Sequence, residues 1–141
     1  DDEFVKENNI KFEIGKAIQI GDGTDASIIA TGVTVAEALK AQEALKEKGI
    51  NIRVIDVHTI KPLDKEMIIK CAKETKRIIT IEDHSIIGGL GTAVCEVLSE
   101  NFPAKVTRIG INDTFGESGK AEELLKKYNL NSEYLVKILS K

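Results

Sequence analysis

Four short apolar runs, separated by segments with a helical apolar period, constrain this chain more than any other feature of its sequence. The runs occupy residues 27–31, 52–57, 78–81 and 106–111. Between them, apolar side chains recur every three or four residues, which is typical of helices that bury one face. Short strands that alternate with such helices form parallel sheets with right-handed crossovers. The pattern therefore predicts a three-layer α/β/α domain.

A further segment, residues 12–20, has a different period. Apolar residues occupy alternate positions from Phe12 to Ile20, with an interruption at Lys16. An alternation of period two with one wet face predicts an edge strand. Because this strand is flanked differently from the other four, it could run antiparallel to them. It would add a fifth strand to the four apolar runs.

The length of 141 residues fits one domain with its own hydrophobic core. Residues 1–11 are largely polar and show no period, so we interpret them as a linker or a frayed terminus and assign the domain to residues 12–141. Because the sequence has no initiator Met, we expect a fragment of a longer protein. The net charge of −3 and the lack of a long apolar run argue against nucleic acid or a membrane as a partner.

Capping residues predict where three of the helices begin. Thr34 and Glu37 match a capping box, and Asp64 is expected to cap a helix that runs through Thr75. Ser132 is expected to cap the last helix. In the tail, the predicted inner positions are Leu124, Leu125, Leu135, Val136 and Leu139.

Candidate functional residues follow the predicted strands. Open α/β sheets bind ligands beyond the carboxyl ends of their strands, at the point where the winding reverses. One glycine follows the first apolar run, and a dense polar stretch follows the third, just before a glycine-rich turn that opens a helix. The crevice or interface candidates are Gly32, Asp83, His84, Ser85, Gly88, Gly89 and Gly91.

These candidates allow more than one interpretation. The amides of the glycine-rich turn could receive a small anion, or the glycines could let the backbone approach a neighbouring loop or subunit closely. His84 could carry a proton or donate a hydrogen bond, or it could tie together the backbone of a solvated loop. For His58, a structural role is favoured.

The sequence lacks the common catalytic motifs. It has neither a P-loop nor a G-x-S-x-G elbow. Two His and two distant Cys do not supply the ligands of a zinc site. Cys71 and Cys95 lie in apolar helical patterns, so we predict that both are small core residues, which fits a reducing cytoplasm.

Three loop motifs resemble the C-terminal domain of transketolases. They are residues 58–64 (HTIKPLD), 82–91 (EDHSIIGGLG) and 113–119 (DTFGESG), and Gly32 also fits. The resemblance implies a five-stranded mixed sheet of order 1-3-2-4-5 with strand 1 antiparallel. That order would bring Gly32 and His84 to one crevice.

The resemblance also implies a function. Transketolases transfer a two-carbon ketol unit between sugar phosphates in the pentose phosphate pathway. Two preceding domains, one from each subunit of a dimer, hold thiamine diphosphate and Mg²⁺. No catalytic, cofactor-binding or metal-binding residue of the family falls in this domain. Residues 21–23 (GDG) share letters with the family's cofactor motif, but they lack its downstream Asn and are interpreted as a turn.

This chain is accordingly expected to be a cytoplasmic protein that is inactive alone. It would support dimer contacts and active-site loops, with the preceding domains or a separate N-terminal subunit as its partner and a homodimer as the full enzyme. Two other interpretations stay open within enzymes, namely the end of a deoxyxylulose-phosphate synthase or of a 2-oxo-acid dehydrogenase beta chain. Outside enzymes, the chain could be a stand-alone anion-binding module or an interaction domain.

Overall fold

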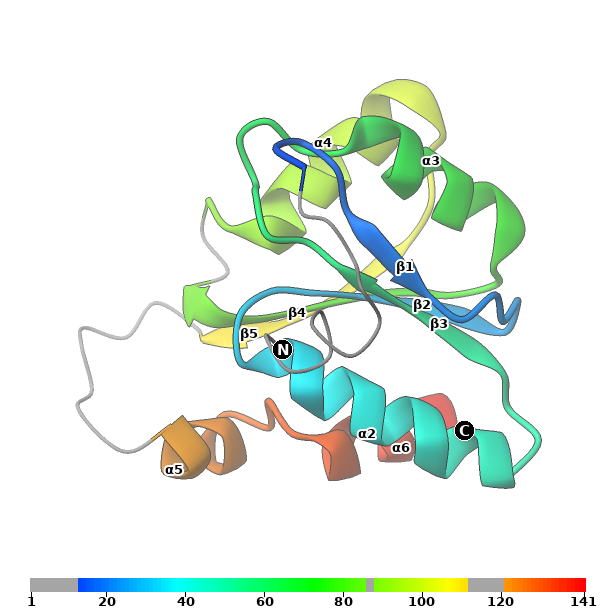
Figure 1. The fold of residues 1–141 in the computed structure, drawn as a ribbon, viewed down its shortest axis with the longest axis vertical. Coiled ribbons are helices and arrows are strands. Elements are labelled where there is room, and N and C mark those ends of the chain that lie inside the picture. The colour runs from blue at the N-terminus through cyan, green and yellow to red at the C-terminus, as the bar shows by residue number, and fades with distance from the viewer. Residues whose placement is uncertain (1–12, 86–87, 112–120) are drawn as a thin grey trace.

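The computed structural model describes residues 13–85, 88–111 and 121–141. Strands and helices alternate along most of the chain (Figure 1). In chain order the elements are β1 Ile18–Ile20, β2 Ala26–Ala30, α2 Thr34–Glu47, β3 Ile52–Asp56, α3 Lys65–Glu74, β4 Ile78–Ser85, α4 Leu90–Asn101, β5 Val106–Ile111, α5 Ala121–Lys127 and α6 Ser132–Leu139.

The five strands form one mixed sheet in the order β1-β3-β2-β4-β5. β2 is parallel to β3 and β4, and β4 is parallel to β5, whereas β1 pairs antiparallel with β3. The predicted sheet and its order are therefore confirmed. Because Ala30 of β2 pairs with Ile81 of β4, the carboxyl ends of these two strands lie side by side.

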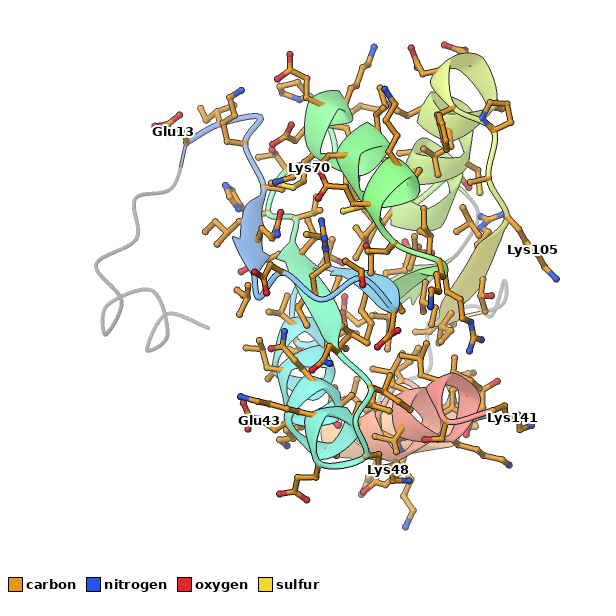
Figure 2. All side chains as sticks on the ribbon, turned by 90° about the vertical axis from the view of Figure 1, so that its right-hand side faces the viewer. Glu13, Glu43, Lys48, Lys70, Lys105 and Lys141 are labelled. Carbon is orange, nitrogen blue, oxygen red and sulfur yellow. The ribbon has the colours of Figure 1, made fainter. Side chains whose placement is uncertain are left out.

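Helices cover both faces of the sheet. Figure 1 shows α3 and α4 on one face and α2, α5 and α6 on the other. In Figure 2, Glu43 and Lys48 mark the outer side of the α2 layer, and Lys70 marks the opposite layer. Successive residues of β2 serve the two layers, since Ile28 and Ile29 belong to different core clusters and are both fully buried. Burial on both faces explains why β2 has consecutive apolar residues at Ile28 and Ile29 and does not alternate between apolar and polar side chains.

The predicted core positions are largely confirmed. Leu135 and Leu139 of α6 are buried, as is Cys71 of α3, and burial raises the pKa of the Cys71 thiol. Cys95 and Val136 are only half-buried. Each directly follows a buried residue, and one step along a helix turns a side chain by about 100° away from the buried face.

The predicted edge strand is shorter than expected. β1 comprises only Ile18–Ile20, and Ile14 is 84% exposed. The chain before β1 makes a turn at Gly15, where φ is +77°. The Gly15 amide donates to Thr59 Oγ1 and the Ala17 amide donates to Asp64 Oδ2, so these amides bond to side chains after β3 instead of extending the sheet.

Two of the three predicted helix caps are wrong. Val33 is the N-cap of α2, with no side-chain cap bond, and the Thr34 hydroxyl donates to the carbonyls of Thr31 and Ile81 instead. Asn131, rather than Ser132, caps α6 by accepting from the Tyr134 amide.

The third predicted cap is confirmed. Asp64 caps α3 by accepting from the Met67 amide, and the helix ends just before Thr75. The capping box at Thr34 fails because both of its members bond to distant segments. The Thr34 hydroxyl donates to the Ile81 carbonyl, and the Glu37 carboxylate accepts from the Ser132 amide. At α6, the side chain of Asn131, one residue earlier, accepts the bond that was expected for Ser132.

Arg53 joins the amino-terminal side of the sheet to α3. This buried guanidinium donates to the carbonyls of Gly23 and Asp22 at 2.8 and 3.3 Å, and it pairs with Glu74 at 2.8 Å. A Cβ atom at Gly23 would lie 2.3 Å from the carbonyl carbon of Asn51, so only glycine fits there. The segment that holds Asp22 and Gly23 therefore has a structural role.

Candidate functional site

At the carboxyl edge of the sheet, the loop after β2 meets β4. The Thr31 amide donates to the Ile81 carbonyl at 3.4 Å. Gly32 follows with φ at +58°, and a Cβ atom there would lie 3.2 Å from Asp83 Oδ1. The carboxylate of Asp83 thus lies against Gly32, and this contact is called the Gly32–Asp83 contact below. A larger residue at Gly32 would require both a left-handed backbone and a shift of Asp83.

Glu82 lies inside β4 and not in a loop after it. The strand continues through Ser85, with an irregularity in its pairing to β5 after Ile81, so the predicted strand end at Ile81 is wrong. The Glu82 side chain is 1% exposed. Oε1 accepts from the Leu90 amide at 2.8 Å, and Oε2 accepts from the Gly91 amide at 2.9 Å. Its charge is thus stabilised by two hydrogen bonds and by the amino end of α4.

The bonds of Glu82 decide what the glycine-rich turn can do. An anion at a helix amino end needs the free amides of the first turn. The amides of Leu90 and Gly91 are already used by a carboxylate of the chain itself. The structure therefore favours an internal structural role for the start of α4 over the binding of an external anion.

Gly91 serves close packing. A Cβ atom there would lie 2.7 Å from Arg108 Nε and 3.0 Å from Thr80 Oγ1, so α4 approaches β4 and β5 closely at this point. Gly88 differs, because φ is +71° and a Cβ atom would contact nothing within 4 Å. Gly89 is the N-cap of α4. The close-approach interpretation is thus supported at Gly91, although the neighbours are strands of the same chain.

Thr34 links α2 to the same edge of the sheet. Its hydroxyl donates to the Ile81 carbonyl at 3.0 Å and to the Thr31 carbonyl. It therefore joins the first turn of α2 to β4 and to the loop that follows β2. Since Thr34 is fully buried, these bonds satisfy a hydroxyl that water cannot reach.

Asp56 is a buried acid at the end of β3 that sequence reasoning did not select as a site residue. It is 2% exposed, and burial raises the pKa of its carboxyl above the ordinary 3.8. The charged form of this group is therefore costly where it lies. The signal available in the sequence was an acidic residue at the end of an apolar run. Glu82, which directly follows the apolar run 78–81, has the same signal.

The two histidines differ in what the structure describes. His58 is exposed after β3, and its Nε2 lies 3.2 Å from the Glu13 carbonyl, which agrees with a structural contact. The backbone of His84 and Ser85 belongs to β4, whereas their side chains lie outside the described part of the structure. The role of His84 stays a prediction. The motif at residues 113–119 and the segment 1–11 also lie outside the described residues.

Among residues 13–85, 88–111 and 121–141, no group of three or more His, Cys, Asp and Glu is arranged to hold a metal ion. The carbonyls of Asp22 and Gly23 accept from Arg53, so this Gly-Asp-Gly segment is engaged within the fold. In the same described part, no helix is both long and apolar enough to cross a membrane.

A comparison with known protein families finds one family that matches most of the chain. The family model described as "Transketolase, C-terminal domain" matches residues 15–135. The chain belongs to this family. The match covers the whole sheet and the Gly32–Asp83 contact, so the resemblance of the loop motifs is confirmed as family membership.

Individual relatives in the transketolase family are consistent with this. The chain is 54% identical over 140 residues to a putative transketolase C-terminal section of Methanocaldococcus jannaschii, covering 97% of this chain and 43% of that protein. It is 40% identical over 131 residues to a 1-deoxy-D-xylulose-5-phosphate synthase of Clostridium tetani, covering 92% of this chain and 21% of the relative.

A solved structure described as a split gene transketolase in an inactive beta4 tetramer is 42% identical. It superposes with a TM-score of 0.85 over 94% of this chain and 43% of that one. The chain thus spans less than half the length of each of these three proteins.

Proposed function

We propose that this chain is the C-terminal section of a transketolase and that it supports, without performing, the transfer of a two-carbon ketol unit between sugar phosphates. Its partner would be the preceding domains or a separate N-terminal subunit that holds thiamine diphosphate and Mg²⁺. The complete enzyme would be a dimer of such units in the cytoplasm, with a role in the pentose phosphate pathway. The thiazolium of the cofactor supplies the carbanion chemistry when bound.

The observation that carries this proposal is the internal use of the carboxyl edge. In a nucleotide-binding α/β domain, the helix amino ends at this edge receive phosphate. Here Glu82 occupies the amino end of α4, and Asp83 lies against Gly32 beside the amino end of α2. Two negative charges at this edge disfavour a diphosphate, which supports a domain that works next to a cofactor held elsewhere.

Reconstitution tests the proposal. The chain is mixed with the remainder of the enzyme, produced as its own polypeptide, and ketol transfer is followed with thiamine diphosphate, Mg²⁺, a ketose phosphate and an aldose phosphate. We expect turnover only in the mixture. Calorimetric titration of the chain alone with thiamine diphosphate should give no heat of binding. Turnover by the chain alone, or its binding of the cofactor at micromolar concentration, would refute the proposed division of roles.

One alternative has specific support, namely the end of a deoxyxylulose-phosphate synthase. The identity of 40% to such an enzyme is close to the 42% identity to the split gene transketolase. The same reconstituted mixture separates the two, because the synthase joins pyruvate to an aldehyde phosphate with release of CO₂. Pyruvate-dependent CO₂ release without ketol transfer would favour the synthase.

A further inference from the structure

A groove of about 510 Å³ lies between the segment that follows β3 and helix α4. Residues 60–63 and Lys65 form one wall, and Thr92, Ala93 and Glu96 of α4 line the other. One wall follows the carboxyl end of β3 and the other follows that of β4. The groove therefore lies at the same edge of the sheet as the Gly32–Asp83 contact.

The floor of the groove is apolar. Ile60 and Leu63 are half-buried and pack on the core cluster of the α3 and α4 layer. Val97 belongs to that cluster and is 7% exposed. Ala93 is half-buried and small, so the groove keeps its depth at the point where α4 passes it. An apolar side chain entering here would be removed from water on several sides, as an interface anchor is.

The rim of the groove carries positive charge on one wall. Lys61 and Lys65 are exposed there, and within the described residues neither forms an ion pair. Lys65 is the first residue of α3, where the helix dipole is already positive and an acidic side chain would be the stabilising choice. Glu96 lies on the opposite wall. The rim therefore complements a carboxylate on the lysine side of an apolar anchor.

We propose that this groove docks an apolar segment with an adjacent acidic residue, carried by the polypeptide that holds the rest of the transketolase. The inference rests on the proposed function. The partner is taken to be the rest of the transketolase because the chain spans only 43% of two transketolase relatives. The exposed Lys61 and Lys65 complement an acidic residue on such a partner. A second copy of this chain is the competing occupant that the experiment must exclude.

Charge reversal and filling of the groove test the proposal. Lys61→Glu with Lys65→Glu reverses the rim, and Ala93→Leu fills the floor without a change of charge. The matched control reverses Lys105 and Lys141, which Figure 2 shows on the surface and which do not line the groove. The dissociation constant for the remainder of the enzyme is measured by calorimetry for each variant, after circular dichroism has established that it is folded.

We expect a complex weaker by about tenfold or more for the rim variant and for Ala93→Leu, with the control within about twofold of wild type. Raising the salt concentration should weaken the wild-type complex more than the complex of the rim variant.

If wild type and rim variant bind equally while the mixture is active, the groove proposal is overturned and the proposed function stands. If the wild-type mixture neither binds nor turns over, the proposed function itself fails. Sedimentation of the chain alone tests the competing occupant. If the wild-type chain forms a homo-oligomer and the rim variant does not, the proposed occupant is overturned and the groove is assigned to a second copy of the chain.

Discussion

Glu82 illustrates how one residue can change what a loop is able to do. It is an acid in a buried strand, and its two oxygens accept from successive amides of α4. A carboxylate in this position is stable only because the helix amino end supplies donors and partial positive charge. The same contacts remove the site that an external anion would need.

Replacing Glu82 should destabilise the domain strongly. Glu82→Ala leaves the amides of Leu90 and Gly91 buried without acceptors, and we expect the free energy of unfolding to fall by about 3 kcal/mol. Urea denaturation followed by circular dichroism measures this. Glu96→Ala, which removes an exposed carboxylate from α4, is the control and should change stability little. A Glu82→Ala midpoint equal to wild type would contradict the capping role.

Replacing Asp56, unlike replacing Glu82, should stabilise the domain at neutral pH. Because burial raises the pKa of its carboxyl in the folded state, the stability linked to this group is complete below 3.8 and is lost as the pH rises through the raised value. Asp56→Asn removes the buried charge, so the variant should be more stable than wild type at pH 7.

The advantage of Asp56→Asn should disappear as the pH falls. Urea midpoints measured between about pH 3 and pH 7 for variant and wild type should converge at the acidic end, where Asp56 is protonated in both the folded and the unfolded chain. A constant difference over this range would mean that the substitution acts through packing and not through charge.

At the scale of elements, the turn before β2, strand β3 and helix α3 are joined through Arg53. The guanidinium is 2% exposed and bonds to two backbone carbonyls as well as to Glu74. A buried guanidinium requires partners for most of its donors. Glu74 is half-exposed, so its contribution is partly screened by water.

The Glu74 partner should make stability depend on pH. The hydrogen bond from Arg53 holds the pKa of Glu74 below the ordinary 4.5, so its stabilising effect is present above 4.5 and is lost as the pH falls through the lowered value. Glu74→Gln should therefore be less stable than wild type at pH 7, and the gap should narrow towards pH 3. Glu100→Gln, an exposed change on α4, serves as the control in the same urea titrations. A gap that widens on acidification would be the wrong sign for this mechanism.

At the scale of the whole molecule, one sheet serves two helical layers, and this should make unfolding cooperative. The two core clusters meet through the strands, where neighbouring residues such as Ile28 and Ile29 face opposite layers. Loss of packing on one face therefore weakens the support of the other. Both tyrosines, Tyr128 and Tyr134, pack on the α2 side and report on that layer alone.

A destabilising mutation in one layer should consequently lower the stability of the other layer by the same amount. Leu98→Ala empties a buried site in α4 and should lower the free energy of unfolding by about 3 kcal/mol. Tyrosine fluorescence, which reports on the opposite face, should show the same shift of the urea midpoint as circular dichroism. Two separate transitions would show that the layers unfold independently.

The class of fold, the order of elements, most core positions and the family could be predicted from the sequence. They follow from features that are local along the chain. Apolar period distinguishes a strand from a helix, and Asp64 caps α3 through an amide only three residues away. The loop motifs that resemble transketolases are also contiguous stretches of sequence.

Which polar groups meet depends on the folding of distant segments onto one another. Glu82 bonds eight and nine residues ahead, Thr34 bonds to Ile81, and the predicted partner Glu37 instead accepts from the Ser132 amide, 95 residues away. Local propensity contains no information about such partners, because a polar side chain bonds to whichever buried donor or acceptor packing brings near it. The Gly32–Asp83 contact, the groove and the occupied amino end of α4 are therefore properties of the folded chain.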